Sequence, residues 1–144
     1  MIHLLLTALA VVAPVFSTVA PSTGTPAQGS ATMAPVLIDS GLAQGAADFT
    51  RPTPQLTMSL VTSGLAPYGN ATFDLNASGL VSMTITSPEG TPTIVSGVWR
   101  GTAAGGYLVA RAIYGTPGPG MRFHTFELKW YANGTAVGGW RLYN

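Results

Sequence analysis

Short runs of alternating apolar and polar residues, separated by turn-forming residues, make up the chain after Pro54. The clearest run is LVSMTIT at 80–86, in which Val81, Met83 and Ile85 fall on one face and serine and threonine residues on the other. Successive side chains of a β-strand point to opposite faces, so this period of two predicts a half-buried strand.

Seven such runs follow one another at intervals of about ten residues, a spacing typical of β-sandwich domains. They span Gln55–Thr62, Ala71–Asn76, Leu80–Thr86, Thr93–Arg100, Tyr107–Tyr114, Arg122–Tyr131 and Thr135–Tyr143. In the sixth run Phe126, Leu128 and Trp130 share one face. Asn133-Gly134 lies between the last two runs and favours a hairpin, because both residue types tolerate positive φ.

This pattern predicts an all-β domain, an antiparallel β-sandwich of about seven strands that is Ig-like or jelly-roll-like. Because the last run reaches Tyr143, we expect Asn144 to lie at the end of the fold. The large side chains expected in the core are Phe73, Trp99, Tyr107, Phe126, Trp130 and Trp140.

The first 54 residues differ in composition and lack the alternating pattern, which predicts an N-terminal arm (1–54) ahead of the β domain (55–144). No acidic or basic residue precedes Asp39, and the stretch from Ile2 to Val15 is nearly continuous apolar sequence. Residues 1–20 are similar to a secretory signal peptide, although no Lys or Arg precedes the apolar run and a proline follows the natural cleavage residue. We favour an uncleaved arm that buries its apolar side against other subunits, with a cleaved signal as the alternative.

The rest of the arm, residues 21–54, is rich in Ser, Thr, Gly, Ala and Pro. Such a composition cannot bury enough apolar surface to order itself, so this stretch would be a linker when isolated. Within it, we expect one helical turn in Asp39–Phe49, capped by Asp39 or Ser40.

Charged residues make up 8% of the chain, against about a quarter in an ordinary soluble domain. Six basic residues balance five acidic ones, so the net charge predicts no nucleic-acid or anionic-lipid partner. With so few charges, copies of the chain repel one another only weakly. This predicts that much of the surface is covered in a homo-oligomer or larger assembly. The absence of cysteine excludes disulfides, thiolate chemistry and cysteine-ligated zinc.

Residues suited to acid–base chemistry are few. They are His3, His124, Asp39, Asp48, Asp74, Glu89 and Glu127. Their spacing matches neither a paired-carboxylate mechanism nor a metal site. His124 alternates with Phe126 and is expected to be a packed or rim histidine, whereas Glu127 and Lys129 are expected to form a solvated charge pair. We therefore expect no enzyme activity, no catalytic residue, no cofactor and no metal.

Four tyrosines near strand ends could form a sugar-binding platform or cap the core, and we favour the second interpretation. They are Tyr68, Tyr114, Tyr131 and Tyr143. Three asparagines, Asn70, Asn76 and Asn133, begin N-x-S/T sequences. Asparagine is a common turn residue, which accounts for these triplets better than glycosylation does.

Four motifs of the C-terminal half resemble a β domain found in virion proteins of tailed bacteriophages. They are a hydrophobic-Asn-x-x-Gly opening at Leu75–Gly79, Gly-x-Trp at Gly97–Trp99, a Tyr-x-Val-Arg-type strand at Tyr107–Arg111 and a Trp-x-x-x-Gly hairpin at Trp130–Gly134. The resemblance covers residues 75–144, and Arg111 falls one position late in it. It implies a virion structural role without catalysis, in a capsid decoration or a tail appendage or fibre.

Arg111 has two interpretations. Its planar guanidinium could anchor one subunit to another through a bidentate pair. It could equally make a salt bridge or cap at a sheet edge.

Together these observations predict a bacteriophage virion structural protein, held through its arm by other virion proteins and by copies of itself. A host-surface glycan or receptor would be a further partner. The alternative is an exported cell-surface or secreted β-sandwich module, sugar-binding or adhesive, from which a signal peptide is cleaved.

Overall fold

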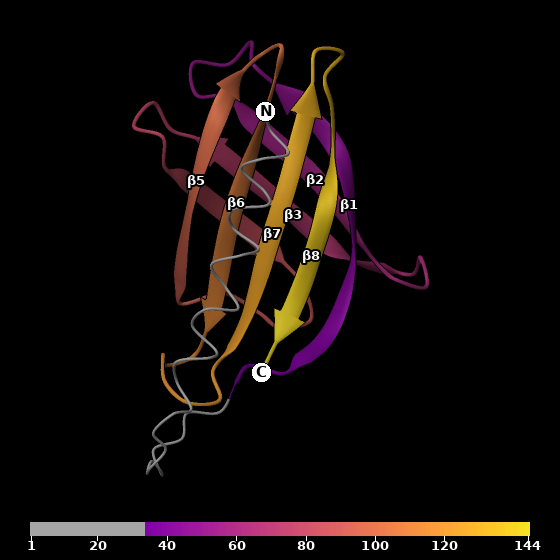
Figure 1. The fold of residues 1–144 in the computed structure, drawn as a ribbon, viewed down its shortest axis with the longest axis vertical. Coiled ribbons are helices and arrows are strands. Elements are labelled where there is room, and N and C mark those ends of the chain that lie inside the picture. The colour runs from indigo at the N-terminus through magenta and orange to yellow at the C-terminus, as the bar shows by residue number, and fades with distance from the viewer. Residues whose placement is uncertain (1–33) are drawn as a thin grey trace, which may run out of the picture. The chain divides into compact units, whose positions relative to one another are not determined.

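The computed structural model describes residues 34–144, which form an all-β unit of eight strands. The strands are β1 (Leu37–Asp48), β2 (Gln55–Thr62), β3 (Pro67–Leu75), β4 (Val81–Thr86), β5 (Ile94–Thr102), β6 (Gly105–Tyr114), β7 (Arg122–Tyr131) and β8 (Thr135–Tyr143). Strands β5 to β8 stand side by side in one layer, and β2 and β3 cross behind them (Figure 1). Within this part of the chain, no helix could cross a membrane.

All eight strands belong to one antiparallel sheet with the order β4-β3-β2-β1-β8-β7-β6-β5. The two outer strands approach each other at a single bridge between Leu80 and Val98, beside which Trp99 N–H donates to Gly79 O at 3.0 Å. The sheet is therefore nearly closed into a barrel. The predicted all-β class and antiparallel pairing are confirmed, but the seven-stranded, two-sheet sandwich is not. Apart from β1 and β8, neighbouring strands follow one another along the chain, without the Greek-key crossovers of Ig-like and jelly-roll folds.

The segment predicted as a helical turn, Asp39–Phe49, instead contributes most of strand β1. This strand pairs with β2 on one side and with β8 on the other, so the β unit begins at Pro35 rather than at residue 55. Its inward positions hold only small residues, because β1 passes close to its neighbours. A Cβ atom added at Gly45 would collide with the carbonyl oxygen of Thr57.

The seven runs of alternating residues all form strands. Val81 and Ile85 are buried as predicted, and so are Phe126, Leu128 and Trp130. The interior of the sheet is filled by a cluster of 19 buried apolar side chains and by one buried polar residue, His124. Among the side chains expected in the core, Tyr107 is the exception and is 48% exposed. Leu108 takes the inward position on β6, so its neighbour must point outward.

The sheet has two ends. The terminal end is the one that holds Val36 and Asn144, and the hairpin end is the one that holds the β7–β8 turn at Gly134. At the terminal end, Asn144 N–H donates to Val36 O at 2.9 Å, so Asn144 lies at the end of the fold as predicted. At the hairpin end, Gly134 has φ 87° and its N–H donates to Tyr131 O at 2.9 Å, which confirms the hairpin predicted at this turn. Residues 1–33, including the apolar run and the signal-like segment, lie outside the described residues.

Candidate functional site

The carboxylates of the β unit lie apart from one another, each with a local polar partner. Asp74 accepts a hydrogen bond from Gln55 Nε2 at 2.8 Å, and Glu89 forms a salt bridge with Arg122 at 3.0 Å. Asp48 accepts from the backbone and hydroxyl of Thr50, and Asp39 accepts from the Ser40 N–H. Within residues 34–144, no group of three or more His, Cys, Asp or Glu residues could hold a metal ion.

Glu127 pairs differently from the prediction. Its carboxylate lies 3.7 Å from Arg141 Nη1 on the neighbouring strand, and it forms no salt bridge with Lys129 in the described structure. Side chains two apart on one strand are separated by about 7 Å along it, whereas residues on adjacent strands are closer. The charge pair is therefore made across strands β7 and β8.

His124 is fully buried near the terminal end and holds hydrogen bonds on both ring nitrogens. Its Nε2 lies 2.9 Å from Tyr68 Oη, and its Nδ1 lies 2.7 Å from Tyr114 Oη. Both phenol rings and the indole of Trp140 meet the imidazole edge-on. The packed histidine predicted from the sequence is confirmed. His3, the other candidate, lies outside the described residues.

Burial sets the protonation of this His–Tyr–Tyr cluster. It lowers the pKa of His124 to about 4, against the weaker opposing effect of the Glu89 and Asp39 charges. It raises the pKa of Tyr68 and of Tyr114 to about 12, against a hydrogen bond with Ser87 that lowers both. At neutral pH the imidazole is therefore neutral, so one of its nitrogens donates and the other accepts. With both nitrogens occupied, the ring has none left to bind a metal or move a proton to a ligand.

The four tyrosines considered as a sugar platform do not come together. Tyr68 and Tyr114 belong to the buried cluster, and Tyr143 stacks on Phe123 with ring centroids 5.0 Å apart. Tyr131 lies at the opposite end of β7 and is 50% exposed. Tyr68 and Tyr114 thus pack at the core as we favoured, whereas Tyr143 and Tyr131 lie on the outer side of the sheet.

Three of the four motifs that carry the phage resemblance contact one another towards the hairpin end, whereas the Tyr107–Arg111 motif lies on the outer side of β6. The indole N–H of Trp99 donates to Asn76 O at 2.7 Å, which joins the Asn-x-x-Gly opening to the Gly-x-Trp strand. The indole N–H of Trp130 donates to Thr102 O at 2.7 Å, and the two indoles lie 6.3 Å apart. A Cβ atom at Gly106 would collide with the Trp130 ring. These residues all serve packing.

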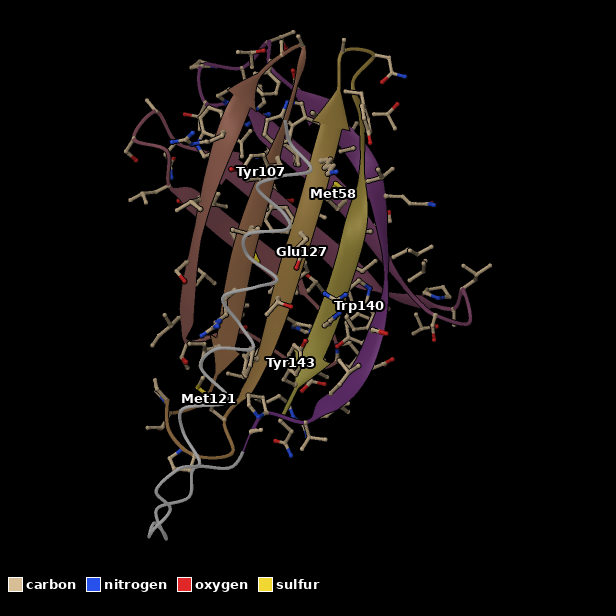
Figure 2. The ribbon with its side chains drawn as sticks, viewed as in Figure 1. Met58, Tyr107, Met121, Glu127, Trp140 and Tyr143 are labelled. Carbon is tan, nitrogen blue, oxygen red and sulfur yellow. The ribbon has the colours of Figure 1, made fainter. Side chains whose placement is uncertain are left out.

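We call the outward-facing surface of strands β5 to β8 the β5–β8 outer face. Figure 2 shows Tyr107, Glu127 and Tyr143 along it. Its exposed apolar residues are Ile94, Val98, Tyr107, Val109 and Tyr131. Its charged residues are Arg100, Arg111, Lys129, Arg141 and Glu127. By contrast, strands β2 to β4 hold a single charged residue, Asp74, and present mainly Ser, Thr, Asn and Gln outward.

Arg111 lies near the middle of the β5–β8 outer face. Its strand β6 has β5 and β7 on either side, so the predicted place at a sheet edge is wrong. Its guanidinium carbon sits 4.9 Å from the centroid of the Phe123 ring, and it forms no salt bridge among the described residues. Sequence reasoning missed this face, because its signal lies in the outward positions of four strands that only the register brings together.

Comparison with known proteins finds no protein-family model, no curated protein and no solved structure that matches the chain.

Proposed function

We propose that the chain is a structural protein of a bacteriophage virion, a capsid decoration or a component of a tail appendage or fibre. It acts without catalysis, in many copies, and is held by the residues that precede β1. The β unit is the part presented outward.

One observation carries the proposal: three of the four motifs that resemble phage virion domains are joined by the contacts of Trp99 and Trp130. Trp99 and Trp130 use their indole N–H groups to tie the β3–β4 and β5–β6 connections to the sheet. This packing supports a structural role for the three motifs. The hydrogen bonds on both nitrogens of His124 and the separation of the carboxylates add support, since the described residues bring no acid–base pair together.

The position of the chain ends also fits attachment through the N-terminal side. Val36 and Asn144 are hydrogen-bonded to each other at the terminal end, so the chain enters the β unit there. The hairpin end and its turns lie at the far side of the sheet. A protein held at the terminal end would present the hairpin end to its surroundings.

Mass spectrometry of purified particles tests this function. The first basic residue is Arg51, and a proline follows it, so trypsin leaves the N-terminal segment in one long peptide. Intact-mass measurement is therefore the better readout. We expect the full chain in the particles, at a fixed ratio to the other virion proteins. Recovery of the chain only from particle-free supernatant would refute the proposal.

The second candidate, an exported binding module, is favoured by the exposed aromatic residues Tyr107 and Tyr131 on the β5–β8 outer face. N-terminal sequencing of the natural product separates the two functions. A mature start between Ser17 and Pro21 indicates export, whereas a start at Met1 or Ile2 indicates the virion arm.

A further inference from the structure

Arginine and hydroxyl side chains alternate in a row across the β5–β8 outer face. The strand register places Ser96 opposite Arg111, Arg111 opposite Thr125, and Thr125 opposite Arg141. Directly opposed residues of antiparallel strands have Cβ atoms about 5 Å apart. Ser96, Arg111 and Thr125 line a groove on this face, together with the carboxylate-bearing Glu127 and with apolar residues that include Val98 and Val109. Guanidinium groups with hydroxyls between them make a set of donors suited to phosphate oxygens.

Both arginines of this row are available to a ligand. Arg111 has no salt-bridge partner in residues 34–144, and the ring of Phe123 supports its guanidinium from one side. Arg141 touches Glu127 only at 3.7 Å, and the two side chains are 51% and 70% exposed. An exposed pair of this kind contributes little stability, so a phosphate could displace the carboxylate at small cost.

A second cationic row runs parallel to the first. Arg100 lies opposite Tyr107, and Tyr107 lies opposite Lys129, so an exposed phenol ring sits between two cations. The β5–β8 outer face therefore carries four cations and one carboxylate, which gives 4 − 1 = +3. The whole chain has a net charge of only +1, so its charge is strongly one-sided. Two copies would repel each other face to face, which favours a partner with negative charge.

Aliphatic side chains lie between the two rows of cations, and they indicate which class of anionic partner fits this face. Val98 and Val109 are directly opposed across β5 and β6 and are 49% and 42% exposed. Free phosphate or a nucleic-acid backbone gains nothing from aliphatic groups at this position. The headgroup region of a bilayer does, because it offers phosphates beside apolar glycerol and acyl atoms. We propose that the β5–β8 outer face binds the phosphate headgroups of an anionic lipid surface.

This inference goes beyond the proposed function and does not depend on it, because it concerns the face of the sheet and not the attachment of the chain. It also revises the expectation drawn from net charge. A near-zero total predicts no attraction to anionic lipid only when the charges are evenly spread.

Flotation of the full chain with lipid vesicles tests the proposal. Phosphatidylcholine vesicles are compared with vesicles that also contain phosphatidylglycerol. The test variant is Arg111→Gln with Arg141→Gln, and the control is Arg51→Gln with Arg122→Gln, which removes the same charge outside the two rows. Each cation near an anionic surface contributes about a fivefold change in affinity, so we expect the test variant to bind the anionic vesicles about 25-fold more weakly. The control should stay within about twofold of the natural chain.

A second variant, Val98→Ser with Val109→Ser, should weaken binding while leaving the preference for anionic vesicles in place. All variants keep residues 2–15, so any vesicle binding by that apolar run is common to them. Equal affinity for both kinds of vesicle would overturn the proposal, as would an unchanged affinity in the test variant. Arginine-dependent binding of a single-stranded oligonucleotide or of inorganic phosphate, without binding to anionic vesicles, would overturn the choice of lipid.

Discussion

His124 occupies an interior position where a charged ring would have no solvent and no facing carboxylate within hydrogen-bonding distance. Tyr68 and Tyr114 satisfy its two nitrogens, and both phenols stay protonated because burial raises the pKa of each to about 12. Protonation of the ring would make both nitrogens donors, so the phenol that donates to the neutral ring would need another acceptor, and a charge would be buried.

We predict that His124 makes the fold sensitive to acid. In the unfolded chain its pKa is about 6.5, whereas burial lowers it to about 4 in the folded protein. Between these values the unfolded state binds more protons, so the free energy of unfolding falls as the pH falls. At pH 4 the loss from this group is about 3 kcal/mol.

Denaturant titrations of the natural chain and of His124→Gln at neutral and acid pH measure this contribution. Glutamine can bond to both phenols but does not titrate, and the carboxylates are common to the two proteins. We expect a shallower dependence on pH in the variant. Identical slopes would show that the buried imidazole is not the source.

The glycine that faces Trp130 gives a second prediction at this scale. A Cβ atom at Gly106 would collide with the Trp130 ring and with the Arg100 carbonyl oxygen. We expect Gly106→Ala to lower the free energy of unfolding by about 1–3 kcal/mol, because the indole is held by its bond to Thr102 and cannot yield. Gly64→Ala is the control, since its Cβ would meet only Thr62 Oγ1 at 3.9 Å. Equal melting temperatures for the two variants would contradict this account.

Among the elements, β1 is the strand that completes the sheet. It connects the β2–β4 part to the β5–β8 part, and without it the sheet would fall into two separate halves. The sequence predicted two sheets from the spacing of seven strands, and that prediction did not include β1.

The reason β1 escaped prediction is visible in its residues. Gly41, Ala43, Gly45 and Ala47 alternate with polar or larger residues, but glycine and alanine give no hydrophobic signal of period two. Gly41 leaves room for the indole of Trp140, which donates to Val61 O at 2.9 Å. The other seven strands were predictable, because their inward residues are large and apolar and their turns hold glycine, proline or asparagine.

The role of β1 sets the limits of the smallest fragment that folds. We expect residues 35–144 to show a β-type circular dichroism spectrum and a cooperative melt. A fragment of residues 55–144 would expose the pairing edges of both β2 and β8 and the side chain of Trp140, so it should aggregate or melt without cooperativity. A cooperative melt of the shorter fragment would show that β1 is dispensable.

At the scale of the whole molecule, charged and exposed apolar residues are distributed unevenly between the faces of the sheet. The number of charged residues in the sequence shows that the total charge is low. It does not show that four of the cations lie together on the β5–β8 outer face. The buried position of His124 followed from its alternation with Phe126, whereas its two phenol partners come from β3 and β6 and could not be paired by sequence spacing. Contacts between residues of distant strands depend on the register of strand pairing. That register is set by the whole, nearly closed sheet.

The proposed attachment of the chain to virions, through the residues before β1, is tested most directly by particle incorporation. The full chain and the 35–144 fragment, carrying the same tag, are produced in cultures that yield particles, and the particles are purified on a density gradient. We predict that the full chain sediments with the particles at a fixed stoichiometry, while the folded fragment stays in the soluble fractions. Absence of the full chain from the particles, or equal incorporation of the fragment, would contradict the account.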